Sequence, residues 1–416
     1  MERHMPEKPI VPIIYHFFPH YRTGVNRELI RSKKYEFLFV GATQSSTGSG
    51  IETWDVPKEA SFLRTHNWMP GGKVLFQSNI VGVALRKDVK TIVFLGDAQF
   101  ITTWIAAALA RLTGKRVLFW SHGWTARDHG IKKVCRMTFY RLAHGMLLYG
   151  HYAKRIGVEM GLRPENLHVI YNSLDYSTQV AMRQSVREEE LTQVRASLFG
   201  SGAKNPMLIC TGRLITVRRL DLLLEAMHFL KEEGHPINLL LVGDGPESAA
   251  LKSQARHQAL AVHFYGACYN EKALARLFMA SDMLVMPGPI GLSAMHSLAY
   301  GTPVLSHDDP THQKPEWESI IPGFNGAYFA HNNSRDLARV LCAWFRNAPD
   351  RTQMRQHCYE IIERFYNSAM QTALIERALD GKLADDSEWD KFCSERCTSA
   401  GDRHIAQPRP FRDIPL

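Results

Sequence analysis

The sequence contains no run of about 18 consecutive apolar residues, the length that a membrane-spanning helix requires. The segment 283–306 lacks Asp, Glu, Lys and Arg, but Pro287, Pro289 and Pro303 prevent it from forming one helix. The N-terminal residues 1–21 also lack the apolar core and the small-residue cleavage site of a signal peptide. These absences argue against an integral membrane protein and predict a cytoplasmic one.

Cysteine is scarce, and its positions do not suggest a set of disulfide bonds. The seven cysteines are an odd number scattered over 416 residues, which argues against a set of disulfides and fits a reducing compartment. Cys393 and Cys397 have no second pair of metal ligands nearby, so we interpret them as bystander thiols rather than as a zinc site.

The charge of the chain is unevenly distributed. The composition, 45% hydrophobic and 22% charged, is typical of a soluble globular protein and excludes a disordered chain and a coiled coil. Residues 1–200 hold 27 Lys and Arg against 16 Asp and Glu, a net charge of +11, whereas residues 201–416 hold 23 against 25, a net charge of −2. This asymmetry predicts that the first half meets an anionic surface or polymer.

Short β-rich segments alternate with longer amphipathic segments, a pattern that predicts parallel sheets covered by helices. We therefore predict an α/β fold of two Rossmann-like, doubly wound domains. Their expected ranges are 1–176 and 205–350, joined by a linker at 177–204 and followed by helices at 351–380 and a loosely ordered tail at 381–416. The expected strands are 11–18, 36–42, 90–97, 115–123, 166–173, 205–214, 237–245, 262–266, 282–287 and 302–307.

Residues that follow the predicted strands are the candidate site, because ligands of open parallel sheets bind at the carboxyl ends of the strands. In the second domain, the loop 288–293 (GPIGLS) leads into a helix whose free N–H groups and partial positive charge suit a phosphate. Arg213 and Arg218 follow the first strand of that domain and could hold a diphosphate opposite this loop. Alone, the two arginines would be read as a solvated basic loop; beside the glycine loop they favour a site.

The run from Thr211 to Phe329 resembles the retaining glycosyltransferases of family 4, which have the GT-B fold. The first half contributes SHGW (121–124) and the segment 149–175, and the resemblance covers about three-quarters of the chain. The matching motifs of the second half are GRLITVRRLDLLLEA (212–226), LLLVGDGPESAAL (239–251), the segment from VHFYG to PVLS (262–306) and PEWESIIPGFNGAYF (315–329).

The resemblance implies roles for individual residues and domains. The second domain would bind the donor nucleotide sugar and the first the acceptor, across a cleft between the two. Catalytic roles are implied for His122, Arg213 and Arg218. The implied donor-binding residues lie mostly in strand-end loops and are Gly24, Gly243, Gly245, Gly266, Gly288, Gly291, Leu292, Ser293, His296 and Glu316.

Three positions depart from the family pattern. The family usually has Glu where this chain has Gly288 and His296; the first Glu contacts the donor sugar and the second the ribose hydroxyls. His296 can still hydrogen-bond a ribose, and the backbone amides of the loop 288–293 would have to hold the sugar. Arg218 stands where the family has Lys, which keeps the positive charge.

The implied reaction transfers a sugar, with retention, from a nucleotide-diphosphate sugar to a glycan or lipid-linked acceptor in cell-surface polysaccharide synthesis. Negative charge grows on the leaving phosphate, where Arg213, Arg218 and the 291–293 amides would stabilise it. No Asp-x-Asp motif stands at a strand end, so we predict transfer without a metal or another cofactor.

A basic and apolar stretch, 127–142, follows the SHG motif. Lys132, Lys133 and Arg136 alternate there with Ile131 and Val134. The stretch alone fits a surface helix with a solvated basic face slightly better than it fits contact with an anionic bilayer. The charge of the first half favours the bilayer, at the inner face of the cell membrane.

Three other functions stay open. A sugar-nucleotide epimerase of the same fold would need acid–base carboxylates in the site, and the motifs show none. A nucleic-acid-binding protein would fit the net charge of +9 but would need basic residues interleaved with stacking aromatics, and the glycine loops would remain unexplained. We therefore expect no nucleic-acid partner. An inactive relative would fit the presence of Gly288 and His296.

Overall fold

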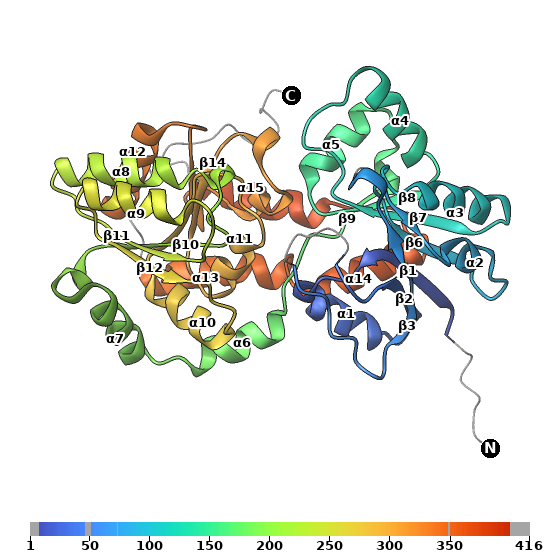
Figure 1. Ribbon diagram of the computed structural model, residues 1–416, viewed down its shortest axis with the longest axis horizontal. Helices are drawn as coiled ribbons and strands as arrows, with labels where there is room; N and C mark the ends of the chain where they lie inside the picture. The colour runs from blue at the N-terminus through green and yellow to red at the C-terminus, as the bar shows by residue number, and fades with distance from the viewer. Residues whose placement is uncertain (1–7, 46–50, 73, 348–349, 400–416) are drawn as a thin grey trace. The chain divides into compact units, whose positions relative to one another are not determined.

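Two parallel β-sheets organise the chain in the computed structural model, which describes residues 8–45, 51–72, 74–347 and 350–399 (Figure 1). Internal contacts divide the chain into two units. Unit 1 comprises residues 1–175 together with 367–386, and unit 2 comprises 176–366 together with 387–416. The chain therefore passes from unit 1 to unit 2 and returns to unit 1 for one helix, and its last described residues, 387–399, belong to unit 2.

Unit 1 has a seven-stranded parallel sheet in the order β3-β2-β1-β6-β7-β8-β9, and β4 and β5 form a separate antiparallel pair. Its strands are β1 Ile10–Phe17, β2 Glu36–Ala42, β3 Ser61–Arg64, β4 Asn67–Trp68, β5 Phe76–Gln77, β6 Thr91–Leu95, β7 Arg116–Ser121, β8 Gly145–Leu148 and β9 Leu167–Val169. Its helices are α1 Thr23–Ile30, α2 Ile80–Leu85, α3 Ile101–Leu112, α4 Gly130–Tyr140, α5 His151–Glu159 and α14 Ser368–Leu379.

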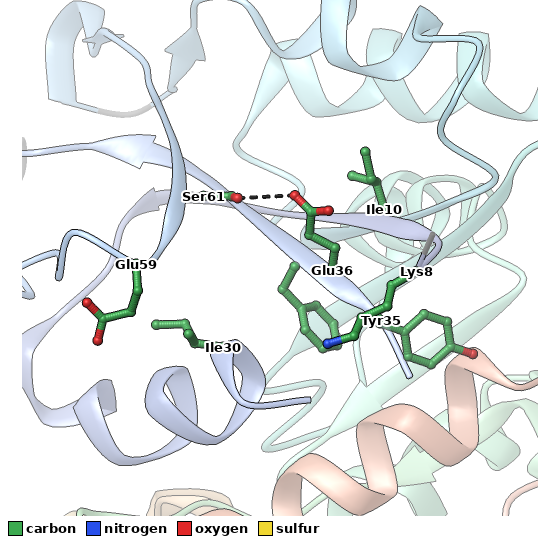
Figure 2. A pocket seen from close by; sticks show the side chains of 8 residues that line it. Lys8, Ile10, Ile30, Tyr35, Glu36, Glu59 and Ser61 are labelled. Atoms are coloured by element: carbon green, nitrogen blue, oxygen red, sulfur yellow. Dashed lines mark hydrogen bonds between the residues drawn. The ribbon is translucent and has the colours of Figure 1, made fainter. Parts of the chain in front are cut away.

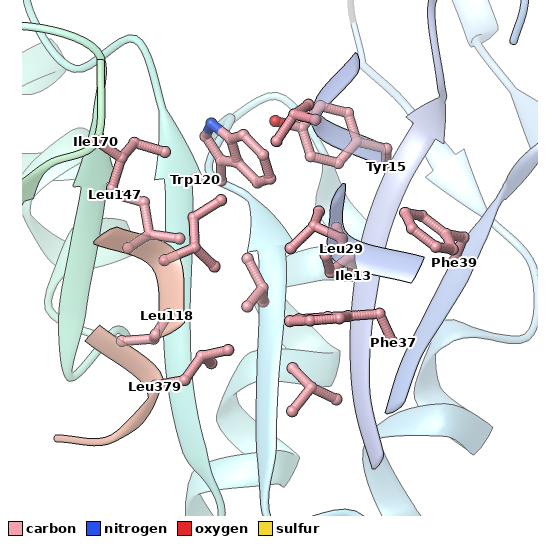
Figure 3. Close-up of a cluster of buried hydrophobic side chains, with 14 of the residues drawn as sticks. Ile13, Tyr15, Leu29, Phe37, Phe39, Leu118, Trp120, Leu147, Ile170 and Leu379 are labelled. Carbon is pink, nitrogen blue, oxygen red and sulfur yellow. The ribbon is translucent and has the colours of Figure 1, made fainter. Parts of the chain in front are cut away.

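The core of unit 1 forms because its central strands are apolar on both faces, as strands of a covered parallel sheet must be. Ile13 and Tyr15 of β1, Leu118 of β7 and Leu147 of β8 are buried in one cluster (Figure 3). Leu379 of α14 packs into the same cluster. The return of the chain to unit 1 thus contributes to its core.

Unit 2 has a six-stranded parallel sheet in the order β12-β11-β10-β13-β14-β15. Its strands are β10 Met207–Thr211, β11 Asn238–Val242, β12 Val262–Gly266, β13 Met283–Met286, β14 Val304–His307 and β15 Gly326–Phe329. Its α-helices are α6 Tyr176–Ser185, α7 Glu188–Phe199, α8 Leu220–Glu232, α9 Ser248–His257, α10 Glu271–Ala280, α11 Leu292–Ala299, α12 Ser334–Asn347, α13 Arg351–Arg364 and α15 Ser387–Ser399. Short 3-10 turns include η5 Thr216–Arg218, η6 Pro310–His312 and η7 Pro315–Ser319.

The segment expected to be a linker, 177–204, is mostly helical, which corrects the prediction. It forms α6 and α7, and both helices pack against α10 of unit 2. Leu191 is buried there, and Arg195 Nη1 lies 2.8 Å from a carboxylate oxygen of Asp282. The polar composition of the stretch reflects the exposed faces of two covering helices rather than a free connection.

The C-terminal predictions also change. Within the expected helices 351–380, α13 belongs to unit 2 while α14 belongs to unit 1. The expected loose tail contains α15, which buries Trp389 and Phe392. The ring of Phe365 lies 5.0 Å from Trp389 and 5.2 Å from Phe392, which explains why this segment is ordered. The rest of the tail, 400–416, lies outside the described residues.

Candidate functional site

The sheet of unit 2 has a switch point between β10 and β13. The strands β11 and β12 continue on one side of β10, whereas β14 and β15 continue on the far side of β13. Loops at the carboxyl ends of two such strands leave in opposite directions, which opens a crevice for ligands. The loop after β10 carries Arg213 and Arg218, and the loop after β13 carries Gly288 and Gly291. The structure therefore brings these predicted residues to one place.

Of the two predicted arginines, Arg218 is anchored and Arg213 is not. Arg218 Nη1 donates to the carbonyl oxygen of Pro289 at 2.6 Å. The backbone N–H of Gly288 donates in turn to the carbonyl oxygen of Arg218 at 2.9 Å. Arg213 is exposed and makes no hydrogen bond or ion pair with any described residue. One guanidinium is thus fixed between the two loops and the other can reach an anion.

Arg219 has a different environment from its neighbours. Its Nε and Nη2 lie 3.2 and 3.1 Å from the carboxylate oxygens of Asp221, and its Nη1 donates to the side-chain oxygen of Asn332. This guanidinium is already engaged within the protein, so we do not place it in the candidate site.

Gly288 has a steric reason to be glycine. A Cβ atom at this position would lie 2.1 Å from the carbonyl oxygen of Val217 and 2.8 Å from Cα of Arg218. Both are backbone atoms, which cannot swing away as the end of a side chain can. The turn that holds Arg218 therefore occupies the space that a side chain at position 288 would need.

Of the predicted glycines 243, 245 and 266, the first two serve close backbone packing, whereas Gly266 has a positive φ of 85° and open space around it. A Cβ on Gly243 would lie 1.9 Å from the carbonyl oxygen of Gly212, and one on Gly245 would lie 2.3 Å from that of Leu214. The N–H of Gly243 donates to the carbonyl oxygen of Gly266 at 2.8 Å. These contacts stack the loops after β10, β11 and β12, and so they set the position of Arg213.

The helix α11 begins at the glycine loop. Gly291 is its N-cap, and no side chain caps it. Leu292 and Ser293 are half-buried in its first turn, and Ser293 Oγ donates to the carbonyl oxygen of Thr211 at 3.3 Å. This bond ties the helix start to the end of β10, next to Arg213. A helix N-terminus in this position suits an anionic group.

His296 faces a carboxylate that the sequence did not lead us to expect. Its Nε2 lies 3.3 Å from Glu271 at the start of α10, and the hydroxyl of Tyr300 donates to the same carboxylate. Burial alone would raise the pKa of Glu271, but its hydrogen bond with His296, the charge of His296 and the bond from Tyr300 hold the pKa below its usual range. No sequence spacing relates positions 271 and 296.

The segment 310–319 braces the glycine loop through Gln313, another residue that the sequence did not reveal. Its side-chain oxygen accepts from the N–H of Ile290 at 2.8 Å, and its Nε2 donates to Ser306 Oγ and to the carbonyl oxygen of His307. The predicted Glu316 lies in η7 and is buried, 3% exposed.

In unit 1, His122 directly follows β7, which ends two residues before the expected end of this strand. It is exposed, and its ring centroid lies 4.7 Å from that of Tyr149 at the end of β8. Gly24 is buried. A Cβ added at this position would lie 2.7 Å from the carbonyl oxygen of Leu174 and 2.8 Å from Cα of Asp175, so the site has no room for a side chain. Gly24 thus packs against backbone within unit 1.

Arg22 is a buried cation that the sequence did not indicate. Its guanidinium carbon lies 4.9 Å from the ring centroid of Tyr15 and 4.7 Å from that of Trp120, and its Nη2 donates to the Tyr149 hydroxyl. Burial, with the charge of Arg22, lowers the pKa of His16 to about 4. The cation and its aromatic neighbours fix Tyr149, which in turn contacts His122.

A pocket of about 520 Å³ lies elsewhere in unit 1, at the amino ends of β1, β2 and β3 (Figure 2). Ser61 Oγ donates to Glu36 across it at 3.2 Å, and Lys8 and Tyr35 also line it. This is the edge of the sheet opposite to His122, so we do not assign the pocket to the candidate site.

Sequence comparisons find a protein family and several relatives that this chain resembles. Residues 198–361 match the family described as Glycosyl transferases group 1. A GDP-mannose-dependent alpha-(1-6)-phosphatidylinositol dimannoside mannosyltransferase of Mycobacterium tuberculosis is 33% identical over 102 residues, 24% of this chain and 26% of that protein. An alpha-monoglucosyldiacylglycerol synthase of Streptococcus pneumoniae is 23% identical over 222 residues, 51% of this chain and 48% of that protein.

Solved structures match over more of the chain. HepE from Anabaena, in complex with UDP, has a TM-score of 0.66 at 16% identity, covering 90% of this chain and all of that one. A glycosyltransferase from Rickettsia africae has a TM-score of 0.67 at 14% identity, covering 89% and 98%. The predicted GT-B fold, with two Rossmann-like units, is confirmed, and the glycosyltransferase group 1 match falls on residues 198–361 of unit 2. The aligned part spans 26% and 48% of the two curated relatives.

Proposed function

We propose that this protein is a retaining glycosyltransferase of family 4 that transfers a sugar from a nucleotide-diphosphate sugar to a glycan or lipid-linked acceptor in cell-surface polysaccharide synthesis. The observation that carries the proposal is the pair Arg213 and Arg218 beside the uncapped start of α11, at the switch point of unit 2. The group 1 match falls on this unit, and HepE in complex with UDP shares the fold.

In this proposal the chain's own cations and amides carry the chemistry. As the bond from the anomeric carbon to the diphosphate breaks, negative charge grows on the leaving phosphate, and Arg213, Arg218 and the amides of the α11 first turn would stabilise it. Attack on the same face of the sugar gives retention, with the leaving phosphate taking the proton of the acceptor. His122 would contact the donor sugar.

The configuration of the product tests the proposal. Purified protein is incubated with a panel of UDP-, GDP- and ADP-sugars, each with and without candidate acceptors, and the anomeric proton of any product is read by NMR. We expect one donor to give a product with the anomeric configuration of that donor. An inverted product would contradict retention, and an epimerised free nucleotide sugar would support the epimerase alternative.

The role proposed for His296 gives a prediction about nucleotide affinity. If it bonds a ribose hydroxyl, His296→Ala should weaken nucleoside diphosphate binding by roughly 0.5–1.5 kcal/mol, about 2- to 12-fold in Kd. His296→Glu should be worse than His296→Gln, because it would set a second carboxylate against Glu271. Combining His296→Glu with Glu271→Gln removes one of the two facing carboxylates, so this double variant should bind the nucleoside diphosphate more tightly than His296→Glu alone. Calorimetry showing equal affinity in His296→Ala would contradict the ribose role.

Metal independence gives a second prediction. Because two guanidinium groups would neutralise the leaving phosphate, kcat should persist in excess EDTA, measured as the rate of nucleotide release. Added Mg²⁺ or Mn²⁺ should not raise that rate by more than a small factor. Complete loss in EDTA that either ion restores would show that a metal supplies the charge instead.

The helix α4 of unit 1 is the part of the chain that we consider for contact with the membrane that carries the acceptor. None of the helices in the described part of the chain is long and apolar enough to cross a membrane. Ile131 and Val134 are 83% and 64% exposed on the first turns of α4, and Lys133 beside them is exposed. We propose that these residues rest on the anionic surface that presents a lipid-linked acceptor.

Two other cations of α4 are less available than the sequence suggests. Lys132 Nζ and Arg136 Nη1 lie 2.9 and 2.8 Å from the two carboxylate oxygens of Asp128, which is buried. Replacing either would leave a buried carboxylate with one partner fewer, so they are poor positions at which to test membrane binding.

We predict that Lys133→Glu will weaken co-sedimentation with anionic vesicles by about 2 kcal/mol, since one cation is replaced by one anion at about 1 kcal/mol each. Ile131→Ser with Val134→Ser should weaken it further. Leu383→Ser, which changes another exposed apolar residue of unit 1, is the matched control. Equal binding to neutral vesicles, or no weakening at high salt, would contradict this contact.

A further inference from the structure

Two histidines and an aspartate converge at the carboxyl ends of β14 and β15. The Oδ2 atom of Asp309 lies 2.7 Å from Nδ1 of His312 and 3.2 Å from Nδ1 of His331. All three candidate ligand atoms lie within 4.8 Å of one another. Asp309 and His312 belong to the turn after β14, and His331 follows β15, so adjacent parallel strands bring them together.

The carboxylate is oriented by a neighbour rather than free to turn. The other oxygen of Asp309, Oδ1, accepts from the backbone N–H of Thr311 at 2.9 Å and from its hydroxyl at 2.7 Å. These two bonds hold Oδ1 toward the turn and leave Oδ2 directed at the two imidazoles. Hydrogen bonds of this kind orient the carboxylate ligands of metal sites.

The second histidine is also held in place. The backbone N–H of His331 donates to Asp308 Oδ1 at 3.0 Å, which pins the loop after β15 to the loop after β14. The His331 ring lies 4.3 Å, between centroids, from the ring of His307, which is fully buried. The first contact therefore holds the backbone of His331, and the second is a packing contact of its ring.

We propose that Asp309 Oδ2, His312 Nδ1 and His331 Nδ1 bind a divalent transition-metal ion, with Zn²⁺ as the best match. Two imidazole nitrogens with one carboxylate suit Zn²⁺ and its neighbours, whereas Mg²⁺ and Ca²⁺ prefer all-oxygen sets. Asp309 and His331 are half-buried and His312 is exposed, so an ion can enter and keep a water as a further ligand.

The consequence of binding would be structural. His312 directly precedes Gln313, which accepts from the N–H of Ile290 in the glycine loop. An ion at this position would therefore brace the loop after β14, and through Gln313 the loop that carries Gly288. It would supply no charge to the leaving phosphate, and the inference does not depend on the proposed transfer activity.

The test is a titration of the full-length, metal-free protein with Co²⁺, a spectroscopic probe for such sites, followed by competition with Zn²⁺. We expect one Co²⁺ per chain, visible d–d absorption without a thiolate charge-transfer band, and displacement by Zn²⁺. His312→Gln and His331→Gln should each lower the affinity by about 100-fold, and Thr311→Val, which removes only an orienting bond, by about 10-fold. His257→Gln, an exposed histidine on α9, should change nothing.

Saturating Zn²⁺ should also raise the thermal midpoint of the wild-type protein but not that of His331→Gln. The proposal is overturned if Co²⁺ does not bind, if a thiolate band shows that cysteines bind it, or if His331→Gln binds as tightly as wild type. In any of these cases the three residues form an ion-paired cluster only.

Discussion

Replacing Arg213 or Arg218 by alanine is expected to lower kcat/KM by about 10²–10³-fold for any donor that the protein uses. Removing one preorganised group that stabilises developing negative charge typically has an effect of this size. Arg218→Ala should have the larger effect, because it also leaves the carbonyl oxygen of Pro289 without its 2.6 Å hydrogen bond. Steady-state kinetics of nucleotide release measure both.

Arg219→Ala is the matched control for this prediction. Arg219 adjoins Arg218, but its guanidinium is already engaged by Asp221 and Asn332. Arg219→Ala should therefore change kcat/KM only a few-fold. The kcat/KM of Arg218→Lys should lie between those of wild type and Arg218→Ala, because the ammonium group keeps the positive charge but cannot make the bidentate hydrogen bonds of a guanidinium group. Near-normal kinetics in both Arg213→Ala and Arg218→Ala would rule out the proposed phosphate clamp.

Gly288→Ala is expected to lower kcat/KM by at least about 100-fold. Its Cβ would lie 2.1 Å from the Val217 carbonyl oxygen, so the turn that carries Arg218 would have to shift. Misplacement of a positioning group by about 1 Å can reduce the rate by about 100-fold. Gly288→Glu, which introduces the residue usual in the resembling family, should be no more active than Gly288→Ala.

Gly291→Ala provides the comparison within the same loop. A Cβ there would have Lys314 Cγ as its nearest neighbour, at 3.9 Å, which is ordinary van der Waals contact. We expect its kcat/KM to stay within about tenfold of wild type, since nothing needs to move. If Gly288→Glu raised activity instead, the close packing of the two loops would not describe the active protein.

Regular elements were the predictable part of the fold. The strands at 36–42 and 262–266 were expected with the bounds of β2 and β12, because each is a short apolar run between polar or turn residues. Gly114 and Gly234, with φ of 77° and 79°, follow α3 and α8, and a glycine in this left-handed conformation is a common helix end. The strand β15 was not among the expected strands, although β13 and β14, which have the same length, were.

Contacts between distant positions were not predictable from one sequence. The fit of Gly288 against Val217 joins loops 71 residues apart in the chain, and nothing in either loop shows it. A contact within one short stretch was missed as well: the stretch 127–142 showed the cations, but the pairing of Arg136 with Asp128 was not expected. The sequence was enough to predict which residues lie at strand ends. Only the structure shows which of those side chains are engaged within the protein and which are available to a ligand.

The most direct test of a diphosphate site at the switch point of unit 2 is a calorimetric comparison of nucleoside diphosphates with the matching nucleosides. We predict that one of UDP, GDP or ADP binds at least about tenfold tighter than its nucleoside, because charge-assisted bonds to the phosphates add to the affinity. That advantage should disappear in Arg218→Ala and persist in Arg219→Ala. Equal binding of diphosphate and nucleoside, or an advantage that survives in Arg218→Ala, would contradict the site.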